Sequence, residues 1–316
     1  MSPKIISLLK GGCKLTVTLI LLCVSLRMIR FDTLMESLRH ANFWLLSLAA
    51  LVLLCGGFAG AASWYCILRA RLPALGYRAA AACHWSGMFF NSFLPSNVGG
   101  DVVKGYIVVR EQGQTGFVVT SLLLDRVANL GMLLCIGVFT FLLQLGYSLW
   151  AVGFLLLLAV SLVGVLASAG RLRDKVRGVP RRGLAGKVAC LLEPVFELAS
   201  TPRLLLPMLL AAFASQFFKT LQNVFVILAL GLKIPTFCVW YVIPLFGIVS
   251  ALPVSIGGLG LREMVAQSLS VPMQIDNTHL VTLSLAGHLM VVLVNMFGVF
   301  PFLFGKRTRA RKGAGD

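Results

Sequence analysis

The chain has 316 residues, of which 58% are hydrophobic and only 12% are charged. Ordinary soluble domains contain roughly 45–50% and about 25% of these classes, so a single soluble core cannot hold this much apolar surface, and much of it must face lipid. The 28 basic and 11 acidic residues leave a net charge of +17. Because the charges lie between apolar runs, they fit cytoplasmic loops beside a membrane and argue against a nucleic-acid-binding protein.

Six apolar segments are long enough to cross a hydrocarbon core of roughly 30 Å, which takes about 20 helical residues. In chain order we predict spans at approximately residues 12–30, 42–66, 117–145, 148–168, 203–231 and 279–304. The apolar run of the first span, Leu15–Leu26, follows Lys4, Lys10 and Lys14 and superficially resembles a signal peptide. It is followed by arginines rather than a small-residue cleavage site, so we predict an uncleaved transmembrane helix.

Two further apolar stretches, residues 79–110 and 235–270, are interrupted by the same pattern, LPxxxGG, at residues 94–100 and 252–258. Apolar segments broken by proline and glycine, at corresponding positions of two halves, are typical of internally repeated transporters. We therefore predict two re-entrant helical hairpins, one in each half of the chain. Counting both as full spans is the alternative, and it leaves the termini on the same side.

We expect the two LPxxxGG breaks to bind an anion, because a helix N-terminus would follow each of them. Pro95 and Pro253 remove a backbone donor and tend to break a helix, and the glycine pairs allow positive φ or close approach of a ligand or a neighbouring helix. A helix that starts after each pair would point free N–H groups at the break, where phosphate binds readily. The basic residues Lys104 and Arg262, each four positions after its glycine pair, would add charge. The alternative is a structural helix break whose basic residue reaches to the interface.

Charged residues also lie inside a predicted span, at Asp125 and Arg126. Isolated charges there cost roughly 2.5–3.5 kcal/mol each, so they normally face a partner or a cavity. The two side chains point about 100° apart on a helix, which predicts different partners. Asp125 would pair with Lys104 or Arg262, and Arg126 would hold a phosphate with two hydrogen bonds. A structural ion pair near the cytoplasmic interface is the alternative.

A polar stripe is predicted in the fifth span, where Gln216, Lys219 and Asn223 share one helical face. The stripe would line a cavity or form interhelical hydrogen bonds. Asn91 would satisfy the broken backbone before Pro95 or contact a ligand. The full predicted substrate-binding set is Asn91, Pro95, Gly99, Gly100, Asp101, Lys104, Asp125, Arg126, Lys219, Pro253, Gly257, Gly258, Arg262 and Glu263.

No catalytic residue, metal site or cofactor is predicted. The four histidines lack metal-ligand spacing, and we expect only His288 to be buried in an apolar run. The eight cysteines form no CxxC pair, so they are expected to be small buried or lipid-facing thiols.

The distribution of positive charge predicts the topology. The loop 169–187 and the tail 306–316 are rich in Lys and Arg, so both are expected in the cytoplasm, together with the N-terminus. We therefore predict an all-α polytopic membrane protein: one membrane domain of six transmembrane helices and two re-entrant hairpins. Its halves, residues 10–145 and 146–305, would be inverted repeats, with the hairpins entering from opposite sides.

The block from Asn91 to Asp101 with Lys104 and Asp125-Arg126, together with Leu252 to Glu263, resembles the lysylphosphatidylglycerol synthase transmembrane-region family, also called the flippase-like domain family. The resemblance covers about residues 10–305. In two-part relatives it implies a membrane region that moves aminoacylated phosphatidylglycerol between leaflets, beside a C-terminal domain that makes this lipid. No such domain precedes Asp316, so aminoacylation is not expected. Lys104 stands where arginine is common in the family, which keeps the charge but loses the bidentate fork.

The expected function is therefore translocation of a lipid with a polar, phosphate-containing headgroup across a bacterial cytoplasmic membrane. The alternatives are a membrane-embedded enzyme that modifies a lipid or polyprenyl phosphate, an accessory subunit of one, or a structural partner of a synthase. Expected partners are anionic or aminoacylated phospholipid, hopanoid or polyprenyl-linked lipid, and a separate lipid-synthesising enzyme. The sequence allows a homo-oligomer.

Overall fold

A computed structural model describes residues 39–93, 99–179, 183–251 and 261–304, and within these ranges the chain forms helices and no strands. Five helices are long and apolar enough to cross a membrane: α3 (Phe43–Leu68), α6 (Thr115–Gln144), α7 (Ser148–Arg177), α9 (Pro202–Ala229) and the stretch Asn277–Leu303. That last stretch combines α12 (Asn277–Asn295), the 3-10 turn Met296–Gly298 and α13 (Val299–Phe304). These helices confirm five of the six predicted apolar segments, and residues 12–30 lie outside the described part of the chain.

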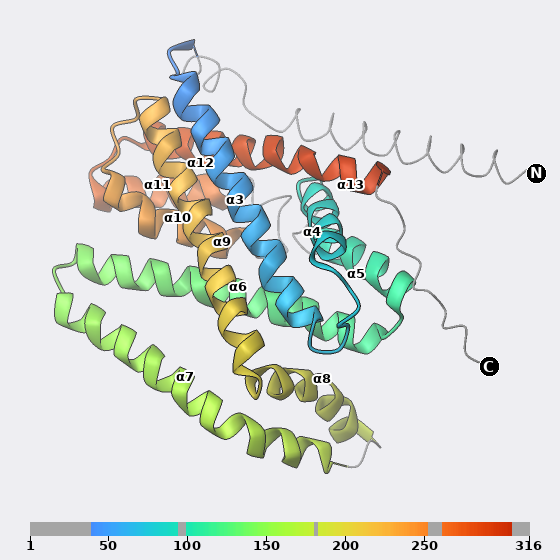
Figure 1. Cartoon of the computed structure of the whole chain (residues 1–316). Coiled ribbons are helices and arrows are strands. Elements are labelled where there is room, and N and C mark those ends of the chain that lie inside the picture. Colours follow the sequence, from blue (N-terminus) through green and yellow to red (C-terminus); the bar gives the residue numbers. More distant parts are fainter. Residues whose placement is uncertain (1–38, 94–98, 180–182, 252–260, 305–316) are drawn as a thin grey trace, which may run out of the picture.

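Helices α3 and α9 pack antiparallel along most of their length and form the centre of the molecule (Figure 1). The backbone N–H of Asn42, before α3, donates to the carbonyl of Ala229 at the end of α9. Small residues bring the two helices together: a Cβ on Gly56 would lie 3.1 Å from Cβ of Phe218, and one on Gly60 would lie 3.1 Å from Oγ of Ser215. Such small-residue contacts are the usual basis of close helix packing in membranes.

Each LPxxxGG pattern separates two shorter helices. The first pair is α4 (Tyr77–Asn91) and α5 (Gly99–Gln112), and the second is α10 (Thr236–Ser250) and α11 (Leu261–Met273). The described structure therefore has a helix on either side of each break. The breaks themselves, with Pro95, Pro253, Gly257 and Gly258, lie outside the described residues.

Each helix pair begins and ends at the same end of the central bundle, and the two pairs use opposite ends. α4 and α5 connect the end of α3 to the start of α6, which lie together because Trp64 Nε1 donates to Ser121 Oγ at 3.2 Å. At the other end, Ile234 before α10 and Ile275 after α11 belong to one buried cluster with Ile227 at the end of α9. Both pairs thus leave and return at one end, as re-entrant hairpins would, and their depth in a bilayer stays a prediction.

The predicted loop at 169–187 is largely helical, which corrects its expected form. α7 continues through the basic residues to Arg177, and a further helix, α8, spans Gly183–Ala199. Arg, Lys, Leu and Ala all favour helix, and positive charge is favourable at a helix C-terminus. The helix therefore continues beyond the apolar run and ends at Arg177, with Gly178 as its C-cap.

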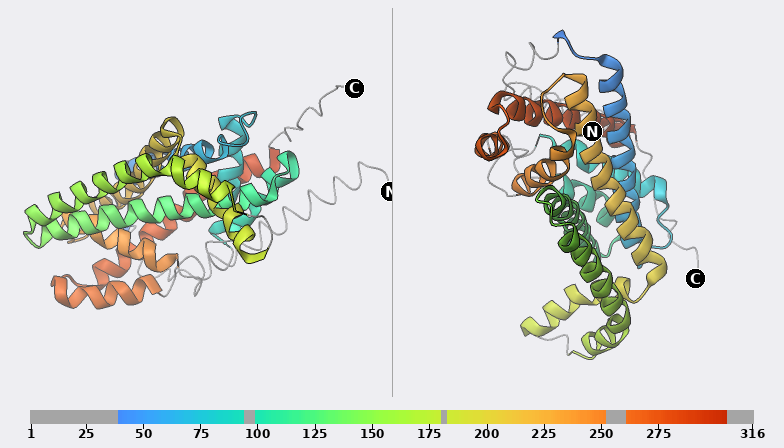
Figure 2. Two further views of the ribbon diagram at one scale, coloured as in Figure 1. Left: turned by 90° about the horizontal axis from the view of Figure 1, so that it is seen from below. Right: turned by 90° about the vertical axis from the view of Figure 1, so that its left-hand side faces the viewer.

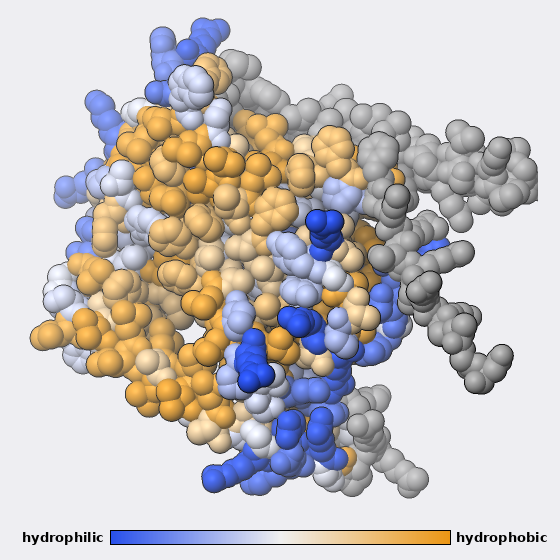
Figure 3. All heavy atoms as spheres, in the orientation of Figure 1, coloured by the Kyte–Doolittle hydropathy of each residue, from blue (hydrophilic) through white to orange (hydrophobic). Residues whose placement is uncertain are grey.

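The outer surface matches a membrane protein. Figure 3 shows hydrophobic residues over most of one face, with hydrophilic residues gathered near α8 and near the start of α3. Helices α6 and α7 extend side by side at the periphery (Figure 2). Most of the large apolar side chains of α7 are exposed, including Leu149 and Val160, as expected of a lipid-facing helix.

Candidate functional site: a polar stripe between two basic motifs

A buried ionic cluster follows the first glycine pair. Lys104 Nζ lies 3.0 Å from Asp125 Oδ2 and 3.1 Å from Asp101 Oδ1, and only 4% of Lys104 is exposed. Arg126 Nε donates to the second carboxylate oxygen of Asp101. The prediction that Asp125 and Arg126 have different partners is confirmed, and the partner of Asp125 is Lys104. Two cations and two carboxylates give the cluster no net formal charge.

Aromatic packing holds this cluster in place. Lys104 Nζ lies 4.7 Å from the ring centroid of Trp64 on α3, a cation–π arrangement. Trp64 is itself fixed to α6 by its hydrogen bond to Ser121. The cluster therefore joins α3, α5 and α6 through one lysine.

α4 packs closely against the start of α5. Asn91 Oδ1 accepts a hydrogen bond from the N–H of Gly100 at 2.7 Å, so Asn91 satisfies the broken backbone, one of its two expected roles. A Cβ on Gly100 would lie only 1.9 Å from the carbonyl oxygen of Gly87. Gly100 is therefore required for close approach of two helices, and α5 begins one residue earlier, at Gly99.

The second motif has a different environment. The Arg262 guanidinium lies 5.4 Å from the ring centroid of Phe246, and its Nη1 lies 3.4 Å from His288 Nδ1. Its buried Nε has no hydrogen-bond partner in the described part of the chain, and no described carboxylate forms an ion pair with it. The adjacent Glu263 instead accepts a hydrogen bond from Ser284 at 3.0 Å.

The predicted stripe on α9 reaches towards both motifs. At one end, Gln216 Nε2 donates to Asn129 Oδ1 at 2.7 Å, and Asn129 Nδ2 donates to Asp125 Oδ1 at 3.0 Å. At the other end, Asn223 lies against α12, since a Cβ on Gly287 would lie 2.3 Å from Asn223 Oδ1. Gly287 immediately precedes His288, the partner of Arg262. The polar side chains of α9 are thus hydrogen-bonded to the first motif at one end, and at the other they pack against the residue that precedes the partner of Arg262.

Lys219 lies in the middle of this row. It is half-buried, and the charges of Asp125 and Lys104 act on it. No described carboxylate lies within ion-pair distance of its Nζ, and no described acceptor forms a hydrogen bond with it. Because the neighbouring cluster is internally neutral, the charge of Lys219 is uncompensated by the described residues.

Several residues of this site were not predicted. His84 is buried as deeply as His288, which corrects the expectation that His288 alone is buried, and the charges of Lys104 and Lys219 both act on it. Nothing in the sequence near His84 indicated this. Asn129 could have been found, since it lies four residues after Asp125 and therefore on the same helical face. Within the described residues, no three His, Cys, Asp or Glu side chains gather closely enough to hold a metal ion.

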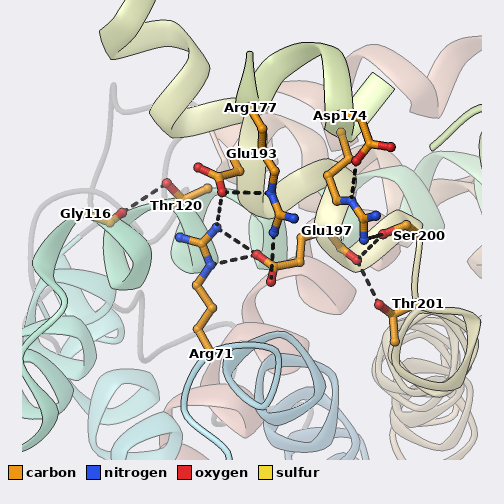
Figure 4. A network of polar contacts seen from close by, with 10 residues as sticks. Arg71, Gly116, Thr120, Asp174, Arg177, Glu193, Glu197, Ser200 and Thr201 are labelled. Atoms are coloured by element: carbon orange, nitrogen blue, oxygen red, sulfur yellow. Dashed lines mark hydrogen bonds and ion pairs between the residues drawn. The ribbon is translucent and has the colours of Figure 1, made fainter. Parts of the chain in front are cut away.

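A second ionic cluster lies where α7 meets α8 (Figure 4). Arg71, after α3, contacts Glu197 at 2.7 Å and Glu193 at 3.3 Å, and Arg177 contacts Glu193 at 3.3 Å. Arg173 Nη1 also donates to Ser200 Oγ at 3.4 Å. The two glutamates are four residues apart on α8, a spacing that could have indicated one shared face. This cluster ties α8 to α7 and to the segment after α3.

Long apolar helices around a buried ionic cluster define a polytopic α-helical membrane protein. A model of the family described as the lysylphosphatidylglycerol synthase TM region matches residues 13–298, and the chain belongs to this family, as its motifs indicated. Membership connects the protein to lipid handling in a membrane. Comparison with curated proteins and with solved structures gave no match.

Proposed function

We propose that the protein moves a lipid with a phosphate-containing headgroup between the leaflets of a bacterial cytoplasmic membrane. The observation that carries this proposal is the polar stripe of α9 inside an apolar helical body. The stripe is hydrogen-bonded to the first basic motif through Asn129 and packs against Gly287, next to the partner of Arg262 in the second. Polar groups at that depth normally face a partner or a pathway. Family membership supports lipid as the cargo.

The first contacts with the headgroup are assigned to Lys219 and Arg262, because neither forms an ion pair with a described carboxylate. Lys104 and Arg126 bind phosphate only by exchanging it for Asp125 and Asp101, the carboxylates that hold them. The paired cluster chiefly fixes α5 against α6, while the headgroup passes along the α9 stripe and the acyl chains stay in lipid.

The two broken helix pairs form the two gates of this pathway. The helices that follow the two breaks, α5 and α11, would offer their N-termini to an anion. The two pairs start from opposite ends of the bundle, which fits inverted-repeat halves. When such halves rock against each other, one site is exposed to each side of the membrane in turn. The positive-inside rule places the α8 end and both termini in the cytoplasm.

The test is headgroup translocation in proteoliposomes that contain labelled phosphatidylglycerol, aminoacylated phosphatidylglycerol or polyprenyl phosphate. The wild type should move at least one class. Arg262→Met should slow that movement about tenfold or more, the effect of losing a charge-assisted hydrogen bond. The matched control is Arg203→Met, at an exposed arginine at the start of α9, and it should move lipid as the wild type does.

Failure of folded wild-type protein to move any lipid class would contradict the proposal. Chemical conversion of the lipid during the assay would identify a membrane-embedded enzyme instead. Equal loss in Arg203→Met and Arg262→Met would show that general surface charge, and not the second motif, carries the effect.

A further inference from the structure

Lys219 lies on one of three helices that carry most of the buried polar atoms without hydrogen-bond partners in the described part of the chain. Seven buried side-chain atoms make no hydrogen bond within the described part of the chain, and six of them lie on the three helices α3, α4 and α9: Ser63 Oγ, His84 Nδ1, Trp85 Nε1, Ser215 Oγ, Gln222 Nε2 and Asn223 Oδ1. Buried polar groups are almost always satisfied. This concentration indicates a polar occupant between the three helices.

The geometry of α9 arranges two of these donors, Ser215 and Gln222, in a row with Lys219. Ser215, Lys219 and Gln222 are spaced four and three residues apart, so they share one face of the helix. Ser215 and Gln222 are fully buried, and Ser215 Oγ and His84 Nε2 both lie within 3.2 Å of the position of a Cβ on Gly60. A hydroxyl, an ammonium group and an amide on one face are well suited to the oxygens of a phosphate.

The balance of charge specifies how negative that phosphate is. The charges that act on Lys219 are those of Asp125 on α6 and Lys104 on α5. These two form an ion pair, and the cluster that they share with Asp101 and Arg126 has no net formal charge. His84, from α4, is the remaining titratable neighbour. Among the described groups around Lys219, the positive charge of Lys219 is therefore left to be compensated, whereas Arg262 lies in the second motif beside His288.

We propose that Lys219 selects lipids whose headgroup carries a single net negative charge, as a phosphodiester without an amine does. The proposal rests on the proposed function and adds the charge class of its substrate. A zwitterionic headgroup would leave the charge of Lys219 unbalanced, and an aminoacylated headgroup with a net positive charge would add to it. Both are therefore disfavoured at this site.

The test compares translocation of tail-labelled phosphatidylglycerol, which has one net negative charge, with tail-labelled phosphatidylcholine, which has none. Wild-type protein should prefer phosphatidylglycerol, and Lys219→Met should reduce that preference about tenfold or more, as expected for one charge-assisted hydrogen bond. Lys219→Arg should keep the preference. Lys233→Met, at the exposed lysine between α9 and α10, is the matched control and should also keep it.

The outcomes separate this inference from the proposed function. A wild type that moves lipid without charge preference, or a Lys219→Met variant that keeps the preference, overturns the selection by Lys219 and leaves translocation intact. A wild type that moves polyprenyl phosphate or aminoacylated phosphatidylglycerol but not phosphatidylglycerol overturns the selection alone, and one that moves none of the tested lipids overturns the proposed function itself.

A binding measurement tests the proposal even when Lys219→Met fails to fold. In detergent, phosphatidylglycerol should raise the melting temperature of the wild type and phosphatidylcholine should not, because a ligand that binds only the native state stabilises it. Equal shifts with both lipids overturn the proposal. An equal shift with soluble glycerophosphoglycerol overturns the assignment of the ligand to a lipid.

Discussion

Lys104 and Arg262 occupy equivalent positions after the two glycine pairs, yet their surroundings differ. Lys104 lies between two carboxylates and over an indole ring, whereas Arg262 lies against an imidazole and a phenyl ring without a carboxylate partner among the described residues. A repeated pattern can therefore place one basic residue in a structural ion pair and leave the other to meet a ligand. The difference arises from Asp101 and Asp125, because Glu263, the acid of the second motif, turns to Ser284.

Loss of Asp125 should have the largest effect on folding. Asp125→Asn leaves the buried Lys104 with Asp101 alone, a carboxylate that it shares with Arg126. Removing one partner of a buried ion pair costs about 3–5 kcal/mol of unfolding free energy. Asp174→Asn removes the exposed partner of Arg173 and should cost less than about 1 kcal/mol. Unfolding in detergent measures both.

A double variant tests whether an unpaired buried charge causes the loss of stability in Asp125→Asn. Lys104→Met with Asp125→Leu replaces charges by apolar groups of similar volume, so it should recover much of the stability that Asp125→Asn loses. If Asp125→Asn unfolds like the wild type, the first motif is not a structural ion pair.

Gly100→Ala should have the next largest effect. The new Cβ would meet a backbone carbonyl of α4 at 1.9 Å, so α4 and α5 must separate, at a cost of about 1–3 kcal/mol. Gly131→Ala, in the middle of α6 with no heavy atom within 4 Å of the new Cβ, is the control. It should be neutral or stabilising by about 0.5–1 kcal/mol. Equal melting temperatures for the two variants would contradict close packing at the first break.

Removal of the second basic residue should affect folding less. Arg262→Met loses a ring contact and one weak hydrogen bond, so its unfolding free energy should change by less than about 1 kcal/mol. A destabilisation as large as that of Asp125→Asn would show that both motifs are structural, and the contrast between them would then fail.

The smallest effect concerns the helix that carries His288. Asp276 caps α12 by accepting a hydrogen bond from the backbone N–H of Thr278 at 2.7 Å, and the hydrogen bonds from Thr278 hold the pKa of Asp276 below its ordinary value of 3.8. Because the folded-state pKa is the lower one, this contribution to stability is present above the unfolded pKa and is lost as pH falls through the folded pKa.

The melting temperature of the wild type should therefore fall slightly more than that of Asp276→Ala between about pH 6 and about pH 3. Asp276→Asn keeps a capping side chain but cannot titrate, so its pH profile should follow that of Asp276→Ala at a higher melting temperature. Identical profiles for all three proteins would exclude a capping role for Asp276.

Much of this architecture could be predicted because membrane spans and helix breaks are local signals. Twenty apolar residues and an LPxxxGG pattern need no knowledge of distant contacts, and Asp125 inside a span required a partner. The choice of Lys104 over Arg262 as that partner depends on which helices meet. The same holds for the bond between Gln216 and Asn129 and for the burial of His84. α8 was missed because its amphipathic sequence lies in a charged region whose composition resembles a loop.

The central claim is that the first motif holds the fold and the second contacts the lipid. Its most direct test measures melting temperature and headgroup translocation on the same preparations of Lys104→Met and Arg262→Met. We predict that Lys104→Met loses stability and translocation together, while Arg262→Met melts within a few degrees of the wild type, as expected for less than about 1 kcal/mol, and loses translocation. Full translocation by a well-folded Arg262→Met protein would contradict the claim.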